Sequence, residues 1–296
     1  MPDPGKYVYN SATTVRGDEA RQTGPTMDQL YLRLYCGAQT TIDRRWRTIG
    51  NRDSFWRLYV NNRDGAALRV GGRWRELGAD AVHLVPAWVR FDCRCRRPVE
   101  HLYVHFDPVG LPGSITRELF ASPASLARDG VVDGLAGRFA EARAREGEGA
   151  RTLGPGASCA AKALAFTALG RLAESLSPAA RRRLTQVAGA DHAVAPALRR
   201  IDARFDRPLR VAELAEACCM SPDHFIRRFR EAVGQTPGRY LAERRVAAAA
   251  EMLLLSEESI ERIAARCGYA DRFHFSRVFK RHIGVPPATY RRSALV

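Results

Sequence analysis

Arginine side chains recur at matching positions in two segments that lie fifty residues apart. The segment 224–230 has the sequence HFIRRFR, and the segment 274–280 has the sequence HFSRVFK. Seven of the seventeen positions from 224 to 240 are identical at this offset, and they include a glycine, a proline and a tyrosine. A solenoid needs about three or more repeats. Two copies therefore indicate a duplicated supersecondary unit.

The first copy has the pattern of a helix, a tight turn and a second helix. Apolar residues before the turn follow a helical spacing, at Val211, Leu214, Ala215 and Cys218. After the turn, Ser221-Pro222-Asp223 supplies an N-cap, a proline at the first helical position and an acid in the first turn. Phe225 and Phe229 are one turn apart and should be buried, which leaves the neighbouring arginines exposed. This pattern predicts a helix-turn-helix.

The second copy repeats the pattern, with one extra residue after the turn. Its first apolar stripe consists of Ile260, Ile263, Ala264 and Cys267. Gly268 lies at the turn, Asp271 is the predicted N-cap, and Phe275 and Phe279 form the buried pair. Cys219 occupies the position of Gly268 in the first copy, where a left-handed backbone would be strained by cysteine.

Exposed arginines on the second helix of each copy could recognise bases, because a guanidinium group can bind O6 and N7 of guanine together. We predict Arg227 and Arg277 as the main base contacts. Further predicted base contacts are Asp223, Ile226, Arg272 and His274. Predicted phosphate contacts are Arg230, Lys280 and Arg281. In a single copy, solvated surface arginines would be an equally good explanation, but the same phase in both copies favours DNA recognition.

A strong helix-forming segment, Tyr240–Leu255, joins the two copies. Sixteen helical residues span about 24 Å at about 1.5 Å per residue. A rod of this length could hold two recognition helices about one DNA turn, or about 34 Å, apart on one face of the duplex.

The repeated segment resembles the C-terminal domain of AraC/XylS-type transcriptional regulators. The first copy carries the resemblance in Leu214-Ala215, Met220–Phe225, Arg227, Gly234, Pro237 and Tyr240. The second carries it in Ile263-Ala264, Cys267-Gly268-Tyr269, Phe275–Lys280, Gly284, Pro287 and Tyr290-Arg291. The resemblance covers about 196–293 and implies that both recognition helices enter adjacent major grooves of double-stranded DNA. It also implies a protein without catalytic activity.

Charge and cysteine content agree with this interpretation without locating the DNA-binding surface. The chain has 47 basic and 32 acidic residues, and almost all of its basic residues are arginine. This excess is consistent with a polyanionic partner, and equally with the codon bias of a GC-rich genome. Seven cysteines without a C-x-x-C pair indicate reduced thiols rather than a zinc knuckle or disulfides. The sequence shows neither a signal peptide nor a membrane span, which predicts a cytoplasmic protein.

The N-terminal part has a β pattern from about 28 to 107, with a predicted two-glycine hairpin turn at Gly71-Gly72. Its segments Gly78–Pro86 and His101–Phe106 resemble a cupin-like effector-binding barrel. The expected fold class is α+β, with a cupin-like β-barrel and trailing helices, followed by an all-α domain of two helix-turn-helix units joined by a helix. The predicted divisions are a flexible arm (1–27), an effector-binding and dimerisation domain (28–177), a linker (178–195) and the DNA-binding domain (196–296).

A polar and aromatic strand face is the candidate ligand site of the barrel. Side chains alternate along a strand, so that His101, Tyr103 and His105 share one face, as do Arg57 and Tyr59. Trp46 is available to stack on a ring. Such a face inside a barrel would suit a hydroxylated ligand such as a sugar, whereas an outer face would meet solvent or the second domain. The spacing of the histidines lacks a cupin metal constellation, and no metal or cofactor is predicted.

The favoured function is a ligand-responsive transcriptional regulator, an activator rather than a repressor. RNA polymerase, a small-molecule effector and a second copy of the chain are the expected partners besides DNA. The helical segment Ala157–Leu176 could form the dimer interface or pack on its own barrel. Two alternatives remain open: an orphan regulator with a ligand-free barrel, and a DNA-linked alkyl-transfer repair protein, which would need a cysteine-rich zinc site.

Overall fold

The N-terminal part of the chain folds into two antiparallel sheets. The computed structural model describes residues 30–109, 111, 113–147, 152–189 and 193–293, so the predicted arm at 1–27 lies outside the described residues. The larger sheet has the order β1 (Tyr31–Ile42), β8 (Val99–Val109), β3 (Trp56–Asn61), β6 (Ala81–Val85) and β9 (Ala124–Ala127). The smaller sheet has the order β2 (Thr48–Asn51), β7 (Phe91–Cys95), β4 (Ala66–Val70) and β5 (Arg73–Glu76).

The two sheets pack face to face around an apolar core but do not close into a barrel. Tyr59 and Val85 of the larger sheet share this core with Leu68 and Phe91 of the smaller one. The predicted closed barrel is therefore wrong. Closure would need hydrogen bonds between the edge strands of the two sheets, but edge strand β5 is four residues long and exposed along its whole length. The predicted hairpin turn between β4 and β5 is confirmed, with positive φ at both glycines.

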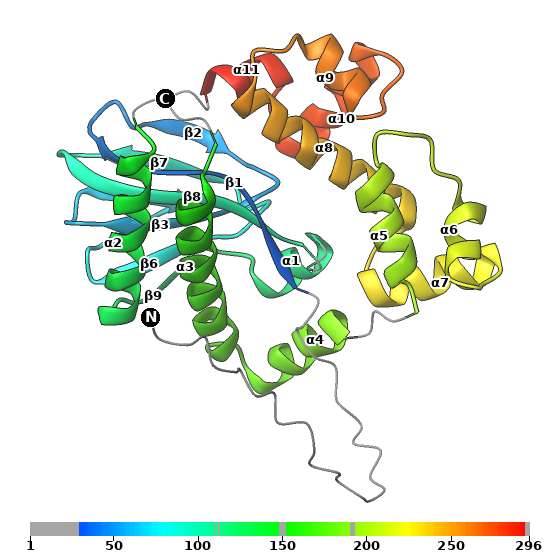
Figure 1. Cartoon of the computed structure of the whole chain (residues 1–296), viewed down its shortest axis with the longest axis horizontal. Helices are drawn as coiled ribbons and strands as arrows, with labels where there is room; N and C mark the ends of the chain where they lie inside the picture. The colour runs from blue at the N-terminus through cyan, green and yellow to red at the C-terminus, as the bar shows by residue number, and fades with distance from the viewer. Residues whose placement is uncertain (1–29, 110, 112, 148–151, 190–192, 294–296) are drawn as a thin grey trace, which may run out of the picture.

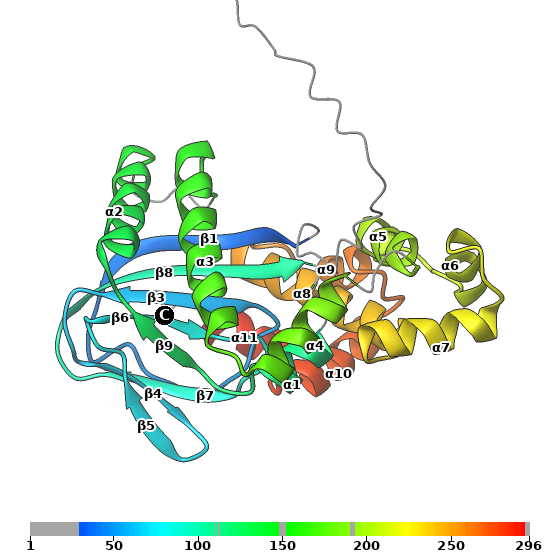
Figure 2. The same cartoon turned by 90° about the horizontal axis from the view of Figure 1, so that it is seen from below.

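Two long helices cover the outer face of the larger sheet (Figure 2). They are α2 (Gly130–Arg145) and α3 (Pro155–Glu174), and their buried side chains, such as Phe139 and Leu164, share one core with Leu102 and Val104 of β8. The helix predicted near 157–176 therefore packs on its own sheet. Phe166 on α3 stays 42% exposed, so that the helix also keeps an apolar outer position.

Helix α1 (Gly113–Leu119) lies between β8 and β9 in the chain, whereas α4 (Pro178–Gly189) connects the N-terminal domain to the second half of the chain. Most of the segment 178–195, which the sequence predicts as a linker, is thus helical. In the described part of the chain, no helix is long and apolar enough to cross a membrane.

The C-terminal half consists of helices, as the sequence predicts (Figure 1). The first unit contains α5 (Ala195–Arg204), α6 (Val211–Ala217) and α7 (Pro222–Val233). The second contains α9 (Ile260–Arg266), α10 (Arg272–Ile283) and α11 (Pro287–Ser293). Between them runs α8 (Pro237–Leu255), whose 19 residues span about 28 Å at about 1.5 Å per residue.

The two helical units have different cores. Phe225 and Phe229 of α7 belong to a small cluster made only of residues from 194 to 241. Phe275 and Phe279 of α10 instead belong to one large cluster that continues through α8 into the sheet domain. The second unit is therefore joined to the N-terminal domain by apolar packing, whereas the first keeps a separate core.

Candidate nucleic-acid interface

Helices α7 and α10 have equivalent buried faces and equivalent ends. Each buries two phenylalanines four residues apart, and each ends at a glycine in the left-handed conformation. Their beginnings differ. Asp271 accepts hydrogen bonds from the backbone N–H groups of Phe273 and His274, at 2.9 and 2.7 Å, whereas Ser221 makes no side-chain cap bond. The bond from His274 contributes most to lowering the pKa of the Asp271 carboxyl.

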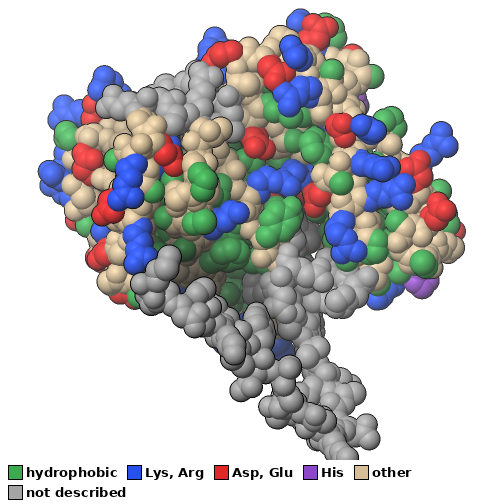
Figure 3. All heavy atoms as spheres, viewed as in Figure 1, with side chains coloured by type: hydrophobic (Ala, Val, Ile, Leu, Met, Phe, Trp, Pro, Cys, Tyr) green, Lys and Arg blue, Asp and Glu red, His purple; other side chains and the backbone are tan. Residues whose placement is uncertain are grey.

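All nine side chains predicted to contact DNA are exposed, including both main candidates, Arg227 on α7 and Arg277 on α10. On α7 the others are Asp223, Ile226 and Arg230. On α10 and its last turn they are Arg272, His274, Lys280 and Arg281. Each helix thus presents arginine on the side opposite its buried phenylalanines. Basic and acidic side chains mix on both halves of the molecule in the view of Figure 3, so charge alone does not mark this surface.

Phe273 was not among the predicted contacts, yet it is 68% exposed in the first turn of α10. The guanidinium carbon of Arg272 lies 5.0 Å from the centre of its ring. Apolar side chains on a recognition helix can contact the methyl group of thymine. The sequence does carry a sign of this exposure, because Phe273 does not share the four-residue spacing of the buried Phe275 and Phe279.

The two turns have the same left-handed backbone, but different residues occupy it. Cys219 has φ +54° and Gly268 has φ +77°. The strain expected at Cys219 is therefore present, because bulkier residues than glycine rarely adopt this conformation. A Cβ atom at Gly268 would lie 2.7 Å from the backbone oxygen of Asp206, so the second turn also packs directly against the first unit.

Arg245 of α8 ties the two units together at this point. Its guanidinium group donates to the backbone oxygens of Phe205 and Arg207, at 2.7 and 2.9 Å. The same group lies 5.5 Å from the centre of the Tyr269 ring in the second unit. One side chain therefore contacts the α5–α6 connection and the turn of the second unit together, which holds the recognition helices in a fixed relation.

Comparisons with known proteins identify this half of the chain. Residues 214–293 match the family described as a helix-turn-helix domain. Regulatory protein SoxS of Salmonella typhimurium is 37% identical over 91 residues, which cover 85% of SoxS and 31% of this chain. The chain belongs to the AraC/XylS family of transcriptional regulators. The family is one of transcriptional regulators.

The match to longer relatives covers a similar length of this chain. HTH-type transcriptional regulator Rv1931c of Mycobacterium tuberculosis is 40% identical over 84 residues, or 28% of this chain and 32% of that protein. The chain thus matches about a third of the length of such AraC/XylS relatives. The crystal structure of ToxT from Vibrio cholerae O395 is similar over 88% of this chain and 97% of ToxT, with a TM-score of 0.53 and 13% identity. This likeness shows that the two proteins share a fold over almost the whole chain.

In the N-terminal domain, the structure brings the predicted ligand-site residues together between the two sheets. Trp46 lies 5.4 Å from His101 between ring centres, and Tyr59 lies 4.7 Å from His101. The row continues from His101 to Tyr103 at 6.1 Å and from Tyr103 to His105 at 5.0 Å. His101, Tyr103 and His105 therefore share one face, as strand alternation predicts. This face points inward. The rings contact one another along this row.

The two histidines of the inward face are uncharged, and its arginine is paired. Burial lowers the pKa of His101 to about 3 and that of His105 well below its ordinary value, so both rings are neutral at pH 7. Arg57, also part of the predicted ligand site, is buried and paired with Asp53. Among the described residues, no group of three or more His, Cys, Asp or Glu side chains could hold a metal ion.

The N-terminal domain contacts α8 and the second helix-turn-helix unit directly. Arg117 of α1 donates to Glu243 of α8 at 3.0 Å. The ring of Trp88 lies 6.1 Å from that of His282 at the end of α10. Trp88 itself has φ +70°, a strained conformation for a bulky residue. A Cβ atom at Gly113 would lie within 2.9 Å of both Glu243 and Trp88, so this boundary is closely packed.

Proposed function

We propose that this chain is a sequence-specific DNA-binding transcriptional regulator that inserts α7 and α10 into adjacent major grooves. The observation that carries the proposal is the pair of equivalent helices, each with buried phenylalanines and exposed arginines in the same phase. Arg227 and Arg277 would bind guanine edges, whereas Arg230, Lys280 and Arg281 would bind phosphate. Because the outward residues of α7 and α10 differ, one monomer would recognise an asymmetric site.

The contacts of Arg245 and Gly268 support simultaneous binding by both helices. If a flexible connection joined the two recognition helices, DNA binding would have to order them relative to each other, and the lost conformational entropy would weaken binding. Here the turn of the second unit packs on the backbone of the first. This arrangement would present both helices to one face of the duplex with little further ordering.

Selection of binding sites from a random DNA pool with the full chain tests the proposal. The expected result is a non-palindromic sequence with two conserved blocks about one turn, or about 10 base pairs, apart. On the selected site, Arg277→Ala should weaken binding by about 1–3 kcal/mol, with a smaller loss on random DNA. Equal loss on both would make Arg277 a phosphate contact, and failure to enrich any sequence would refute specific recognition.

Control by a small molecule is the second part of the proposal. ToxT, which shares the fold, has a structure bound to (E)-4-(8-methylnaphthalen-1-yl)but-3-enoic acid. A hydroxylated effector between the sheets, such as a sugar, would have to separate the stacked rings around His101. The ring contacts around His101 favour the alternative of an orphan regulator whose N-terminal domain binds no ligand. A thermal-shift screen against sugars distinguishes them, because a ligand that binds the folded state raises its Tm.

We further propose that the protein acts as a homodimer in the cytoplasm and activates transcription through RNA polymerase. The outer face of α3, with exposed Phe166, is the proposed dimer contact. Phe166→Glu should shift the full chain from dimer to monomer in sedimentation experiments. A wild-type chain that remains monomeric at high concentration would refute this part of the proposal.

A further inference from the structure

Phe273 is a large apolar side chain that the fold leaves outside the core. It is 68% exposed, whereas the other two phenylalanines of α10, Phe275 and Phe279, are completely buried. A single apolar side chain on a protein surface is ordinary and has no meaning by itself. The position of Phe273 on the helix therefore decides what it can do.

Phe273 lies in the first turn of α10, the part of a recognition helix that contacts base edges. Its backbone N–H group donates to the N-cap Asp271 at 2.9 Å, which fixes the conformation of this turn. Residues three or four positions apart lie on the same face of a helix. Phe273 therefore shares one face with Arg277 and Lys280, both of which are exposed. An apolar ring thus belongs to the stripe that carries the proposed guanine and phosphate contacts.

Arg272 restrains the ring of Phe273. Its guanidinium carbon lies 5.0 Å from the ring centre, a distance at which a cation is attracted to an aromatic face. A side chain that is already restrained loses less conformational entropy when it contacts a partner. The pair therefore presents a preorganised apolar surface beside a positive charge, a combination that suits a base edge next to the phosphate backbone.

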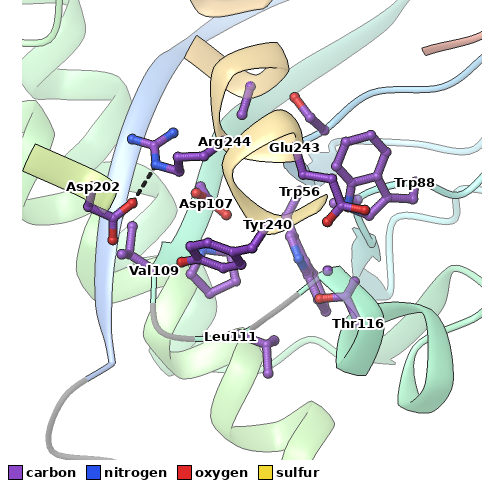
Figure 4. A pocket seen from close by; sticks show the side chains of 15 residues that line it. Trp56, Trp88, Asp107, Val109, Leu111, Thr116, Asp202, Tyr240, Glu243 and Arg244 are labelled. Carbon is purple, nitrogen blue, oxygen red and sulfur yellow. Dashed lines mark hydrogen bonds and ion pairs between the residues drawn. The ribbon is translucent and has the colours of Figure 1, made fainter. Parts of the chain in front are cut away.

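The sheet domain contacts the opposite end of α10. The ring centre of Trp88 lies 6.1 Å from that of His282, which is in the last turn of the helix. Side chains of both halves line a small cavity at the same boundary, among them Asp107, Asp202 and Arg244 (Figure 4). Phe273 precedes His282 by nine residues, or about 14 Å at about 1.5 Å per residue. DNA can therefore reach the ring of Phe273 without separating the two halves.

The equivalent place on α7 carries a different chemistry. Counted from the N-caps Ser221 and Asp271, Asp223 occupies the place of Phe273. Asp223 also precedes an exposed arginine, Arg227, by four positions. Its carboxylate can accept a hydrogen bond from the N4 amino group of cytosine. A phenyl ring has no such group, so that Phe273 can recognise only the apolar atoms of a base edge.

We propose that Phe273 determines specificity by contacting the C5-methyl group of a pyrimidine in the block of the site that α10 reads. This methyl group is the apolar feature of thymine in the major groove. 5-Methylcytosine carries the same group on the same carbon atom. The inference rests on the proposed insertion of α10 into the major groove, and it adds a preference for a methylated pyrimidine close to the guanine bound by Arg277.

Replacing single atoms of the DNA tests the proposal on the full chain. A site is first selected from random DNA, and the block at which Arg277→Ala loses discrimination is assigned to α10. Each thymine of this block is then replaced by deoxyuridine, which removes the methyl group and keeps every hydrogen-bonding group. At one thymine the Kd should rise about fourfold, because burial of a group of this size contributes about 0.8 kcal/mol and about 1.4 kcal/mol corresponds to tenfold.

A second pair of sites separates the methyl group from the rest of the base. At the same position, 5-methylcytosine should bind better than cytosine by about the same factor, although both lack the O4 atom of thymine.

Two variants assign the difference to one side chain. Phe273→Ala should bind the methylated and unmethylated sites of each pair equally, because the ring that contacts the methyl group is gone. Ile49→Ala removes an apolar side chain of similar exposure from β2 and should keep both differences. Thermal denaturation checks that both variants fold, since substitution of exposed side chains changes stability little.

Three results would overturn the proposal: an α10 block without thymine, equal binding within either pair of sites by the wild-type chain, or an undiminished difference in Phe273→Ala. Each of them would leave recognition by two helices intact, because the selected sequence would still exist. Failure to select any sequence would instead refute the proposed function, and the role of Phe273 with it.

Discussion

The two helix-turn-helix units share one sequence pattern but differ in their cores, their turns and their N-caps. Both bury two phenylalanines under an arginine-bearing surface. The first unit has its own core, a strained cysteine at its turn and an N-cap without a side-chain bond. The second has a core continuous with the sheet domain, a glycine at its turn and a capped recognition helix.

This difference separates the features that maintain each unit from the features that join the unit to the rest of the molecule. The phenylalanine pairs and helix ends, which the copies share, maintain the local fold. The turn residue and the surroundings of α10 differ between the copies. Both depend on residues outside the second unit. Apolar packing thus links the N-terminal domain to the second unit, whereas the first unit keeps a core of its own.

The largest expected effect comes from the buried phenylalanines. Phe229→Ala and Phe279→Ala should each reduce the free energy of unfolding by about 3–5 kcal/mol, because each leaves a cavity in a core. Hydrogen exchange should show faster opening only in the first unit for Phe229→Ala. For Phe279→Ala it should extend through α8 into the sheet domain. Identical exchange patterns would contradict the separation of the two cores.

The turn of the second unit should tolerate substitution poorly. Gly268→Ala places a Cβ atom 2.7 Å from the backbone oxygen of Asp206 in a left-handed conformation. The conformation costs about 1–2 kcal/mol and the overpacking about 1–3 kcal/mol. Urea denaturation should show a loss of about 2–5 kcal/mol. An unchanged midpoint would mean that the two units do not pack as closely as described.

The N-caps provide a smaller contrast. Asp271→Ala should reduce the free energy of unfolding by about 1 kcal/mol, because two backbone N–H groups lose their acceptor. Ser221→Ala should have a smaller effect, because Ser221 makes no side-chain cap bond. Thermal denaturation of the two variants at the same pH gives the comparison. Equal losses would show that the caps are equivalent in solution.

The smallest effect should be a gain in stability. Cys219→Gly removes a left-handed strain of about 1–2 kcal/mol and adds about 0.4–1 kcal/mol of backbone entropy to the unfolded chain. The free energy of unfolding should therefore increase by about 0.5–1 kcal/mol. A decrease would show that the Cys219 side chain makes contacts that outweigh its backbone strain.

Local periodicity predicts the helical half well. The stripes of α6 and α9, the buried phenylalanines and the strained turn at Cys219 all follow from short-range spacing, and the structure confirms them. The shared face of His101, Tyr103 and His105 also follows from strand alternation. These features depend on residues within a few positions of each other, which is the range over which sequence patterns carry information.

Contacts between distant segments are not predictable in this way. Asp107 is two residues beyond His105 on β8, so strand alternation predicts that its side chain lies on the same inward face as His101, Tyr103 and His105. Its meeting with Arg244 and Asp202 depends on how the two halves dock. The open edges of the sheets likewise depend on β5 being short and exposed, a property of tertiary packing rather than of any local motif.

Recognition by two unlike helices is tested by profiling the DNA preference of Arg227→Ala and Arg277→Ala beside the wild-type chain. Each variant should lose discrimination at a different block of the site, with the blocks about 10 base pairs apart. Each should lose about 1–3 kcal/mol on the preferred sequence. Loss at the same positions in both variants, or an equal loss on every sequence, would contradict recognition by two unlike helices.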